Sequence, residues 1–89
     1  MSAISIQITY REGKPFAAYI YLGSKPGEKS ARVEPITPEL VIDYAADGRP
    51  LGIEIVSPGT VSEAEIMSVF DRLGLGRPAA AELAPLRAA

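Results

Sequence analysis

Residues 40–56 read Leu-Val-Ile-Asp-Tyr-Ala-Ala-Asp-Gly-Arg-Pro-Leu-Gly-Ile-Glu-Ile-Val, two apolar runs separated by a polar break. Asp47-Gly48 in this break is the strongest short-range signal for a β-hairpin in the chain. A two-residue turn here places every large apolar side chain of both runs on one face, and a four-residue turn keeps the same faces. The pairs predicted by the two-residue turn are Ala46 with Arg49, Tyr44 with Leu51, Ile42 with Ile53 and Leu40 with Ile55.

Two further strands are predicted before this hairpin. Apolar and polar residues alternate over residues 4–10, which is typical of a strand with one buried and one wet face. Residues 11–15 carry turn chemistry, since Gly13 can adopt a positive φ and Pro15 is expected to end the pairing. Residues 16–22 are apolar or aromatic on both faces, so we expect this strand to be central in the sheet.

The next segment, residues 23–30 (GSKPGEKS), is similar at first sight to a phosphate-binding loop. Such a loop has the spacing G-x-x-x-x-G-K-[ST] and leads directly into a helix, whose N-terminus faces the anion. Here the second glycine comes one residue early, Glu28 adds a negative charge and Pro26 removes a backbone donor. Residues 31–36 then have the composition of a strand. We therefore interpret the segment as a loop between two strands.

A helix is expected from residue 61 to residue 73. Two overlapping S/T-x-x-E capping boxes precede it, one starting at Thr60 and one at Ser62. Gly74 is well placed as a left-handed C-cap. Apolar residues recur at helical spacing and are expected to pack on the sheet. These residues are Ile66, Val69, Phe70 and Leu73.

The remaining residues, 75–89, are predicted to form a linker and a short tail that is either helical or disordered. Pro78 is placed to open a short helix in this tail, and Pro85 to end it. The pattern as a whole predicts the α+β class, with a single domain over residues 1–74. Its sheet is expected to be mostly antiparallel, with four or five strands in meander order and one covering helix.

The composition limits the chemistry of the chain. Its 89 residues include no Cys and no His, which excludes disulfides, thiolate or imidazole metal ligands, cysteine nucleophiles and histidine triads. The net charge is −2 and the nine basic residues are scattered, so we expect no nucleic-acid binding.

Location and assembly are also indicated by composition. No apolar run reaches the length of a membrane span, and Met1–Gln7 lacks the pattern of a signal peptide, so we predict a cytoplasmic protein without a membrane partner. Hydrophobic residues make up 47% of the chain, which is a surplus for one small core. This surplus predicts a homodimer or a larger homo-oligomer.

The quoted hairpin, together with Tyr19–Leu22, resembles a small bacterial family known as domain of unknown function 2283. The resemblance covers residues 10–57 and implies a compact antiparallel sheet without an established activity. The chain departs from the family pattern at Arg11, at residues 15–17 and at Ala45, where family members carry acidic residues. If those residues bind a cation in the family, this chain has lost most of that role. The positions that match are Asp43, Asp47, Gly48, Gly52 and Glu54.

Asp43 and Glu54 form the candidate chemical site. By the predicted parity they lie on the face opposite Ile42 and Ile53, as diagonal neighbours roughly 7 Å apart. Two carboxylates can hold a hard cation such as Mg²⁺ or act as acid and base. The other interpretation is that they are ordinary surface residues, which are solvated or pair with arginines. No third ligand accompanies them, which favours the surface interpretation and predicts no cofactor.

Tyr19 and Tyr21 lie on the second face of the 16–22 strand. They are interpreted as an interface rather than as a stacking platform for bases, because no basic groove accompanies them. The sequence therefore predicts a non-catalytic, self-associating interaction or regulatory module, with another bacterial protein as a further partner. The alternative is a divalent-metal or carboxylate-dependent enzyme, or a ligand-binding protein, centred on Asp43 and Glu54.

Overall fold

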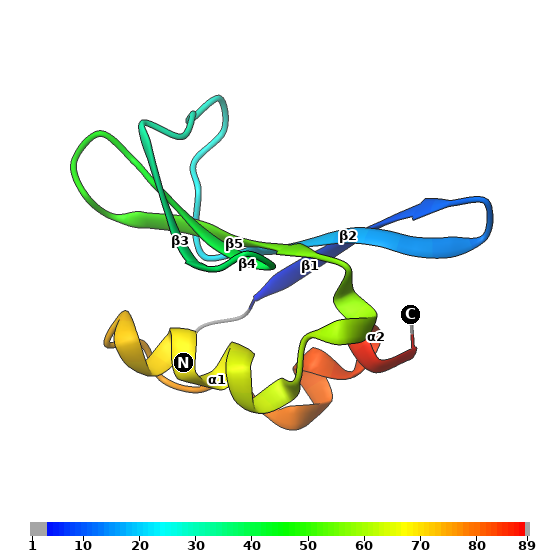
Figure 1. Cartoon of the computed structure of the whole chain (residues 1–89). Helices are drawn as coiled ribbons and strands as arrows, with labels where there is room; N and C mark the ends of the chain where they lie inside the picture. The colour runs from blue at the N-terminus through cyan, green and yellow to red at the C-terminus, as the bar shows by residue number, and fades with distance from the viewer. Residues whose placement is uncertain (1–3, 89) are drawn as a thin grey trace.

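The computed structural model describes residues 4–88 and shows one five-stranded antiparallel sheet with the helical segments on one of its faces (Figure 1). The strands are β1 (Ser5–Arg11), β2 (Lys14–Tyr21), β3 (Arg32–Thr37), β4 (Leu40–Tyr44) and β5 (Pro50–Val56). The helical segments are the short turns η1 (Pro58–Thr60) and η2 (Ala80–Leu83) and the helices α1 (Glu63–Arg72) and α2 (Ala84–Ala88). This arrangement confirms the predicted α+β class. No helix within the described residues is long and apolar enough to cross a membrane.

The strand order is β1-β2-β5-β4-β3, so the sheet is not the simple meander predicted from the sequence. β5 rather than β3 pairs with β2, and residues 22–31 carry the chain across to the far edge. Pro35 gives the physical reason for this order. A proline offers no backbone N–H to a sheet, so β3 belongs at an edge, where it pairs with β4 alone.

β1 and β2 form a hairpin whose two turn residues, Glu12 and Gly13, both have positive φ, 54° and 78°. Such turns have the twist that antiparallel strands require. β2 begins before Pro15, which pairs with Tyr10, so the prediction that Pro15 ends the pairing is wrong. Arg11 and Lys14 close the two-residue turn, and such a closing pair is hydrogen-bonded to each other. The next pair, Tyr10 and Pro15, is therefore a non-hydrogen-bonded pair, so the missing N–H of Pro15 removes no hydrogen bond between β1 and β2.

The β4–β5 hairpin has a three-residue loop, residues 46–48, instead of the two-residue or four-residue turn expected from the sequence. The Gly48 N–H donates to the Ala45 carbonyl over 2.9 Å, and the Ala45 N–H donates to the Arg49 carbonyl over 2.8 Å. Gly48 has a φ of 90°, a conformation that its missing Cβ allows. Ala45 therefore takes the place opposite Arg49 that was predicted for Ala46.

The strand pairs beyond this loop follow the predicted faces. The predicted pairing of Ile42 with Ile53 is confirmed, and so is that of Leu40 with Ile55. Next to the loop, Tyr44 pairs with Pro50 instead of Leu51, because the register shifts there by one residue. Leu40, Ile42, Ile53 and Ile55 still lie on the core side of the sheet, whereas Val41 and Val56 lie on the opposite face.

The core lies between the sheet and the helical layer. Ile20, Ile42 and Ile53, on three neighbouring strands, have no exposed surface. They join the helix stripe in one hydrophobic cluster, which confirms the predicted packing of α1 on the sheet. The buried members of that stripe are Ile66, Val69 and Phe70.

α1 begins at Glu63, two residues later than expected, because it uses the second capping box. The Ser62 hydroxyl accepts a hydrogen bond from the Glu65 N–H over 3.1 Å, and the Ser62 N–H donates to the Glu65 carboxylate over 2.9 Å. Thr60 instead completes η1, where its hydroxyl donates to the Ser57 carbonyl over 2.9 Å. The first capping box is therefore not formed.

The segment after α1 is helical and packs on the core. It starts with Gly74, whose φ of 72° confirms the predicted left-handed cap. Pro78 precedes η2, and Pro85 is the second residue of α2, so the prediction that Pro85 ends a helix is wrong. The fixed φ and missing N–H of proline suit the first turn of a helix. Leu83 and Leu86 are 1% and 5% exposed within the core cluster, so this segment is one wall of the core.

Candidate functional site

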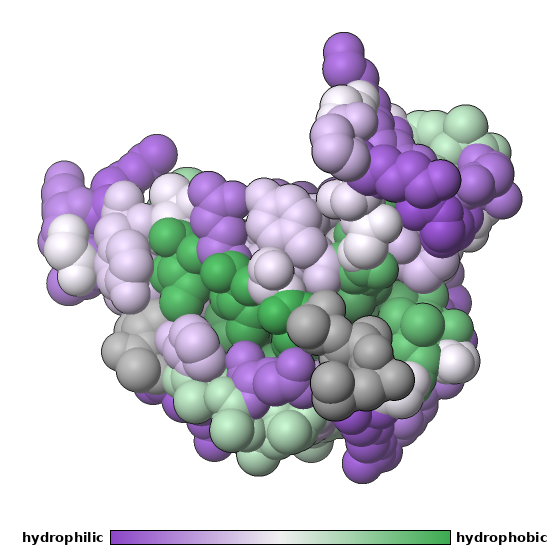
Figure 2. Space-filling view, turned by 180° about the vertical axis from the view of Figure 1, so that it is seen from behind, coloured by the Kyte–Doolittle hydropathy of each residue, from purple (hydrophilic) through white to green (hydrophobic). Residues whose placement is uncertain are grey.

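The face of the sheet opposite the helices, here called the open face, carries the candidate residues of the strands. It lies between two projections, the β1–β2 turn and the loop of residues 22–31 (Figure 1). From behind, it is the hollowed upper surface of the molecule (Figure 2). By strand register, the side chains of this face are Ser5, Gln7, Thr9, Ala17, Tyr19, Tyr21, Val33, Pro35, Val41, Asp43, Glu54 and Val56, with Gly52 between them.

Tyr19 reaches across three strands of the open face. It starts on β2, its ring lies over Gly52 of β5, and its hydroxyl donates to the Asp43 carboxylate of β4 over 2.9 Å. A Cβ at position 52 would overlap the outer atoms of this ring, so the path of the side chain requires glycine there. Burial of the phenol and its hydrogen bond to Asp43 raise the pKa of Tyr19.

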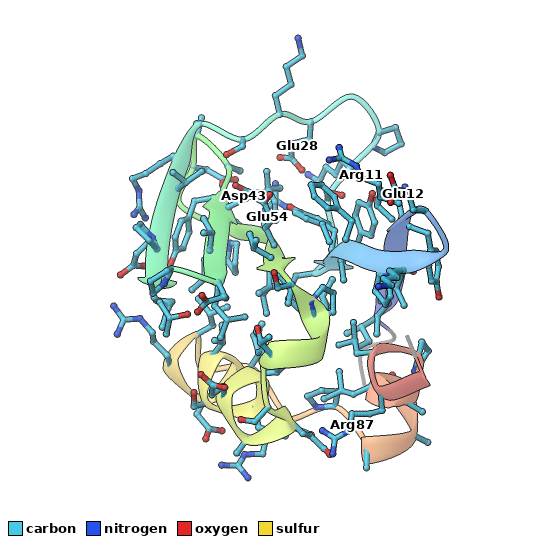
Figure 3. All side chains as sticks on the ribbon, turned by 45° about the vertical axis from the view of Figure 1, so that its right-hand side comes forward. Arg11, Glu12, Glu28, Asp43, Glu54 and Arg87 are labelled. Carbon is cyan, nitrogen blue, oxygen red and sulfur yellow. The ribbon has the colours of Figure 1, made fainter. Side chains whose placement is uncertain are left out.

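The carboxylates of Asp43 and Glu54 both lie on the open face (Figure 3). Asp43 accepts hydrogen bonds from the Tyr19 hydroxyl and, over 3.3 Å, from the Ser30 hydroxyl. Glu54 is exposed to solvent. In the part of the chain that the structure describes, no three acidic, His or Cys side chains come together as metal ligands. Asp43 thus acts as an acceptor that joins β2, β4 and the loop before β3.

Tyr21 lies beside Tyr19, with ring centroids 4.7 Å apart in an edge-to-face arrangement. Its hydroxyl donates to the Gln7 side-chain carbonyl of β1 over 2.7 Å. The two rings and Glu54 line a shallow depression of about 280 Å³ together with Gln7 and Thr9. Its phenols, amide and carboxylate can make hydrogen bonds to a bound group.

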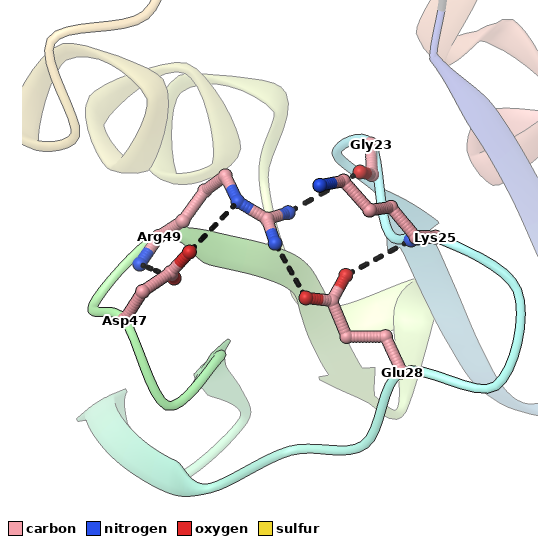
Figure 4. A network of polar contacts seen from close by, with 5 residues as sticks. All are labelled: Gly23, Lys25, Glu28, Asp47 and Arg49. Atoms are coloured by element: carbon pink, nitrogen blue, oxygen red, sulfur yellow. Dashed lines mark hydrogen bonds and ion pairs between the residues drawn. The ribbon is translucent and has the colours of Figure 1, made fainter.

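Arg49 ties the loop of residues 23–30 to the β4–β5 turn (Figure 4). Its guanidinium donates to the Gly23 carbonyl over 3.4 Å and forms an ion pair with Glu28. Glu28 also accepts from the Lys25 N–H over 2.9 Å. These two contacts, the Lys25 amide first and the Arg49 guanidinium second, hold the pKa of Glu28 below its usual value. A strand follows the segment, which confirms its interpretation as a loop between strands.

Asp47 and Gly48, two of the positions that match the family pattern, serve the turn itself. Asp47 accepts a hydrogen bond from the Arg49 N–H over 3.0 Å, and this bond lowers the pKa of the Asp47 carboxyl. The side chains of Asp47 and Arg49 also approach to 3.7 Å. Asp47 and Gly48 therefore lie in the turn, apart from Asp43 and Glu54, which lie on the strands.

Sequence reasoning missed three polar partners. Gln7 and Ser30 carry no pattern that would link them to Tyr21 and Asp43, because these contacts depend on the register of each strand pair and on the path of the loop. The ion pair of Glu28 with Arg49 joins residues 21 positions apart, and its only signal in the sequence is their opposite charge.

One comparison with known proteins gives a match. No curated protein and no solved structure matches the chain. Residues 17–57 match the model of a family described as Protein of unknown function (DUF2283). The matched segment runs from within β2 to the end of β5, so it includes both tyrosines and all five positions named above, and it ends before α1. Through this segment of its sheet, the chain resembles the DUF2283 family.

Proposed function

We propose that this protein is a non-catalytic interaction module that self-associates. The proposal is carried by the one-sided cover of the sheet, because the helical layer lies on one face and leaves the other open (Figure 1). Val33, Val56 and Tyr21 on the open face are 56%, 41% and 37% exposed. Several exposed apolar side chains on one face of a small protein are typical of an interaction surface.

A binding role rather than a catalytic one is supported by the contacts of the candidate residues. Asp43 is engaged by Tyr19 and Ser30, and a cation at Asp43 would compete with both hydroxyl donors. The alternative, a metal-dependent or carboxylate enzyme centred on Asp43 and Glu54, stays a prediction from the sequence. So do the bacterial and cytoplasmic setting and a further protein partner.

Light scattering on the purified protein at micromolar concentration tests self-association. The expected mass is at least twice the 9.4 kDa of one chain. A mass of one chain throughout the micromolar range would overturn the proposal.

A further inference from the structure

β1 is an edge strand whose residues 5–9 carry none of the usual protection against pairing, because its one charged residue, Arg11, ends the strand and its register shift lies between Thr9 and Tyr10. Within the described residues, β2 is its only partner strand. Residues 5–10, Ser-Ile-Gln-Ile-Thr-Tyr, include no charged residue and no proline. Edge strands of natural proteins are commonly blunted by charges, prolines or a covering segment, since their free backbone groups can pair with another chain.

The opposite edge, β3, has this protection. Pro35 removes one backbone donor, and the strand carries Arg32 and Glu34. The Arg32 guanidinium lies 4.0 Å from the centre of the Tyr44 ring, and Glu34 forms an ion pair with Arg72 of α1. The two edges of the same sheet therefore differ in their capacity to accept another strand.

The free backbone groups of β1 belong to Ile6 and Ile8. Even-numbered residues of β2 bond to β5, as the Leu22 N–H does to the Leu51 carbonyl beyond the end of the strand. The odd-numbered residues of β2 therefore bond to β1, where they face odd-numbered residues. The even-numbered residues of β1 are left with N–H and C=O groups that point outward.

We propose that β1 pairs antiparallel with β1 of a second copy, so that two sheets join into one of ten strands. The proposal rests on the self-association proposed above and places its contact at the β1 edge, so the open face stays free for a further partner. A two-fold axis at Gln7 lets Ile6 exchange backbone hydrogen bonds with Ile8 of the partner subunit, and lets Ile8 do the same with Ile6 of the partner subunit. Ser5 then faces Thr9 of the partner subunit on the open face.

A second copy fits this edge for three reasons. The outward backbone groups require an extended strand, and the same edge is present on every copy of the chain. The facing side chains are compatible, isoleucine with isoleucine on the core side and hydroxyl with hydroxyl on the open face. No like charges meet, because Arg11 and the turn lie outside the paired stretch.

The side chains along this edge also leave apolar surface to be covered. Ile4, Ile6 and Ile8 are only partly buried against the core. Figure 2 shows the molecule from this side, where apolar residues form a band between the sheet and the helices. Pairing of two such bands extends the core from one subunit into the next and makes one continuous open face.

Introduced charges of the same or opposite sign test the register of the proposed pairing. Ser5→Lys with Thr9→Lys, both at exposed positions, places lysine opposite lysine at each end of the pairing and should weaken the dimer at least tenfold. Ser5→Glu with Thr9→Glu should do the same. An equal mixture of the two variants should restore a dimer, seen as a heterodimer by native mass spectrometry. The matched control is Ala64→Lys at an exposed position of α1, away from both β1 and the open face, which should leave the dimer unchanged.

Cross-linking supplies a second readout. The chain has no cysteine, so Gln7→Cys introduces one thiol at the non-hydrogen-bonded pair on the two-fold axis, where a disulfide can form. A covalent dimer is expected on mild oxidation of Gln7→Cys, and Ala64→Cys should give none. Melting curves of each variant show that it is folded.

The outcomes separate the two proposals. A monomeric wild-type protein overturns both. A wild-type dimer that persists in the lysine variant, or a mixture of charge variants that stays monomeric, overturns β1 pairing and leaves self-association standing. A dimer that does not cross-link at position 7, or that cross-links equally at position 64, also overturns β1 pairing.

Discussion

The two faces of the sheet share the same five strands and are stabilised in different ways. On the covered face, Ile53 and its neighbours are buried by other apolar side chains, and this stabilisation has no direction. On the open face, Tyr19 follows one path over Gly52 to one carboxylate, Asp43. The first face tolerates hydrophobic side chains of similar volume, whereas the second depends on single atoms.

Gly52 and Ile53 are consecutive residues of β5 that face opposite sides of the sheet, so the comparison can be tested within one strand. The largest effect is expected on the covered face. Ile53→Ala should lower the free energy of unfolding by about 2–5 kcal/mol, because it opens a cavity in a fully buried position. Urea denaturation measures this, with Val33→Ala as an exposed control that should change stability by less than about 0.5 kcal/mol. Equal losses in the two variants would contradict the difference in burial.

A smaller loss is expected from Gly52→Ala on the open face. The new Cβ would overlap the Tyr19 ring, so the ring must move and give up its hydrogen bond to Asp43, at a cost of about 1–3 kcal/mol. The matched experiment repeats the substitution in a Tyr19→Ala background. There Gly52→Ala should cost less than about 0.5 kcal/mol, since the overlapping ring is gone. The same cost in both backgrounds would show that Tyr19 is not the reason for this glycine.

Alkaline pH gives a weaker test of the same contact. The pKa of Tyr19 is raised, chiefly by burial and then by Asp43, so its stabilising effect is complete below the ordinary tyrosine pKa of about 10 and is lost as pH rises above it. Tyr19→Phe cannot ionise and should lose less stability above that pH. The pKa of Tyr44 is raised too, so part of the loss should remain. Melting temperatures from neutral to alkaline pH measure the difference, and parallel curves for the two proteins would contradict it.

The smallest effect is expected from divalent cations. Asp43 is already engaged by two hydroxyl donors, so Mg²⁺, Mn²⁺ or Ca²⁺ at millimolar concentration should leave the melting curve unchanged. Asp43→Asn with Glu54→Gln should keep the fold. A saturable stabilisation by one of these ions that disappears in this double variant would favour the metal-dependent alternative.

Local patterns predicted most of the elements of this fold. The pairing of Ile42 with Ile53 follows from strand periodicity, and the packing of α1 follows from its apolar stripe. The length of the β4–β5 loop did not follow, because a one-residue difference is decided by two backbone hydrogen bonds at Ala45. Strand order did not follow either, although Pro35 carried the signal for an edge.

The candidate site was predictable only in part for the same reason. Gly52 matched the family pattern in the sequence, but Tyr19 could not be named as the side chain over it without β5 beside β2. The burial of Leu83 and Leu86 in the tail was likewise hidden, since two leucines among alanines carry little periodic signal.

The interior place of β5 has a consequence for the way this chain folds. β5 is the last strand to be synthesised, yet it joins the β1–β2 hairpin to the β3–β4 hairpin. An isolated two-stranded hairpin is marginally stable in water, so neither hairpin is stable by itself before residues 50–56 have been synthesised and have paired with both. The pairing of Ala17 with Val56 then closes a long loop, which slows folding relative to local contacts. A nascent chain that has not yet released β5 from the ribosome carries two hairpins with unpaired edges, and this interval is when chaperones would be needed most.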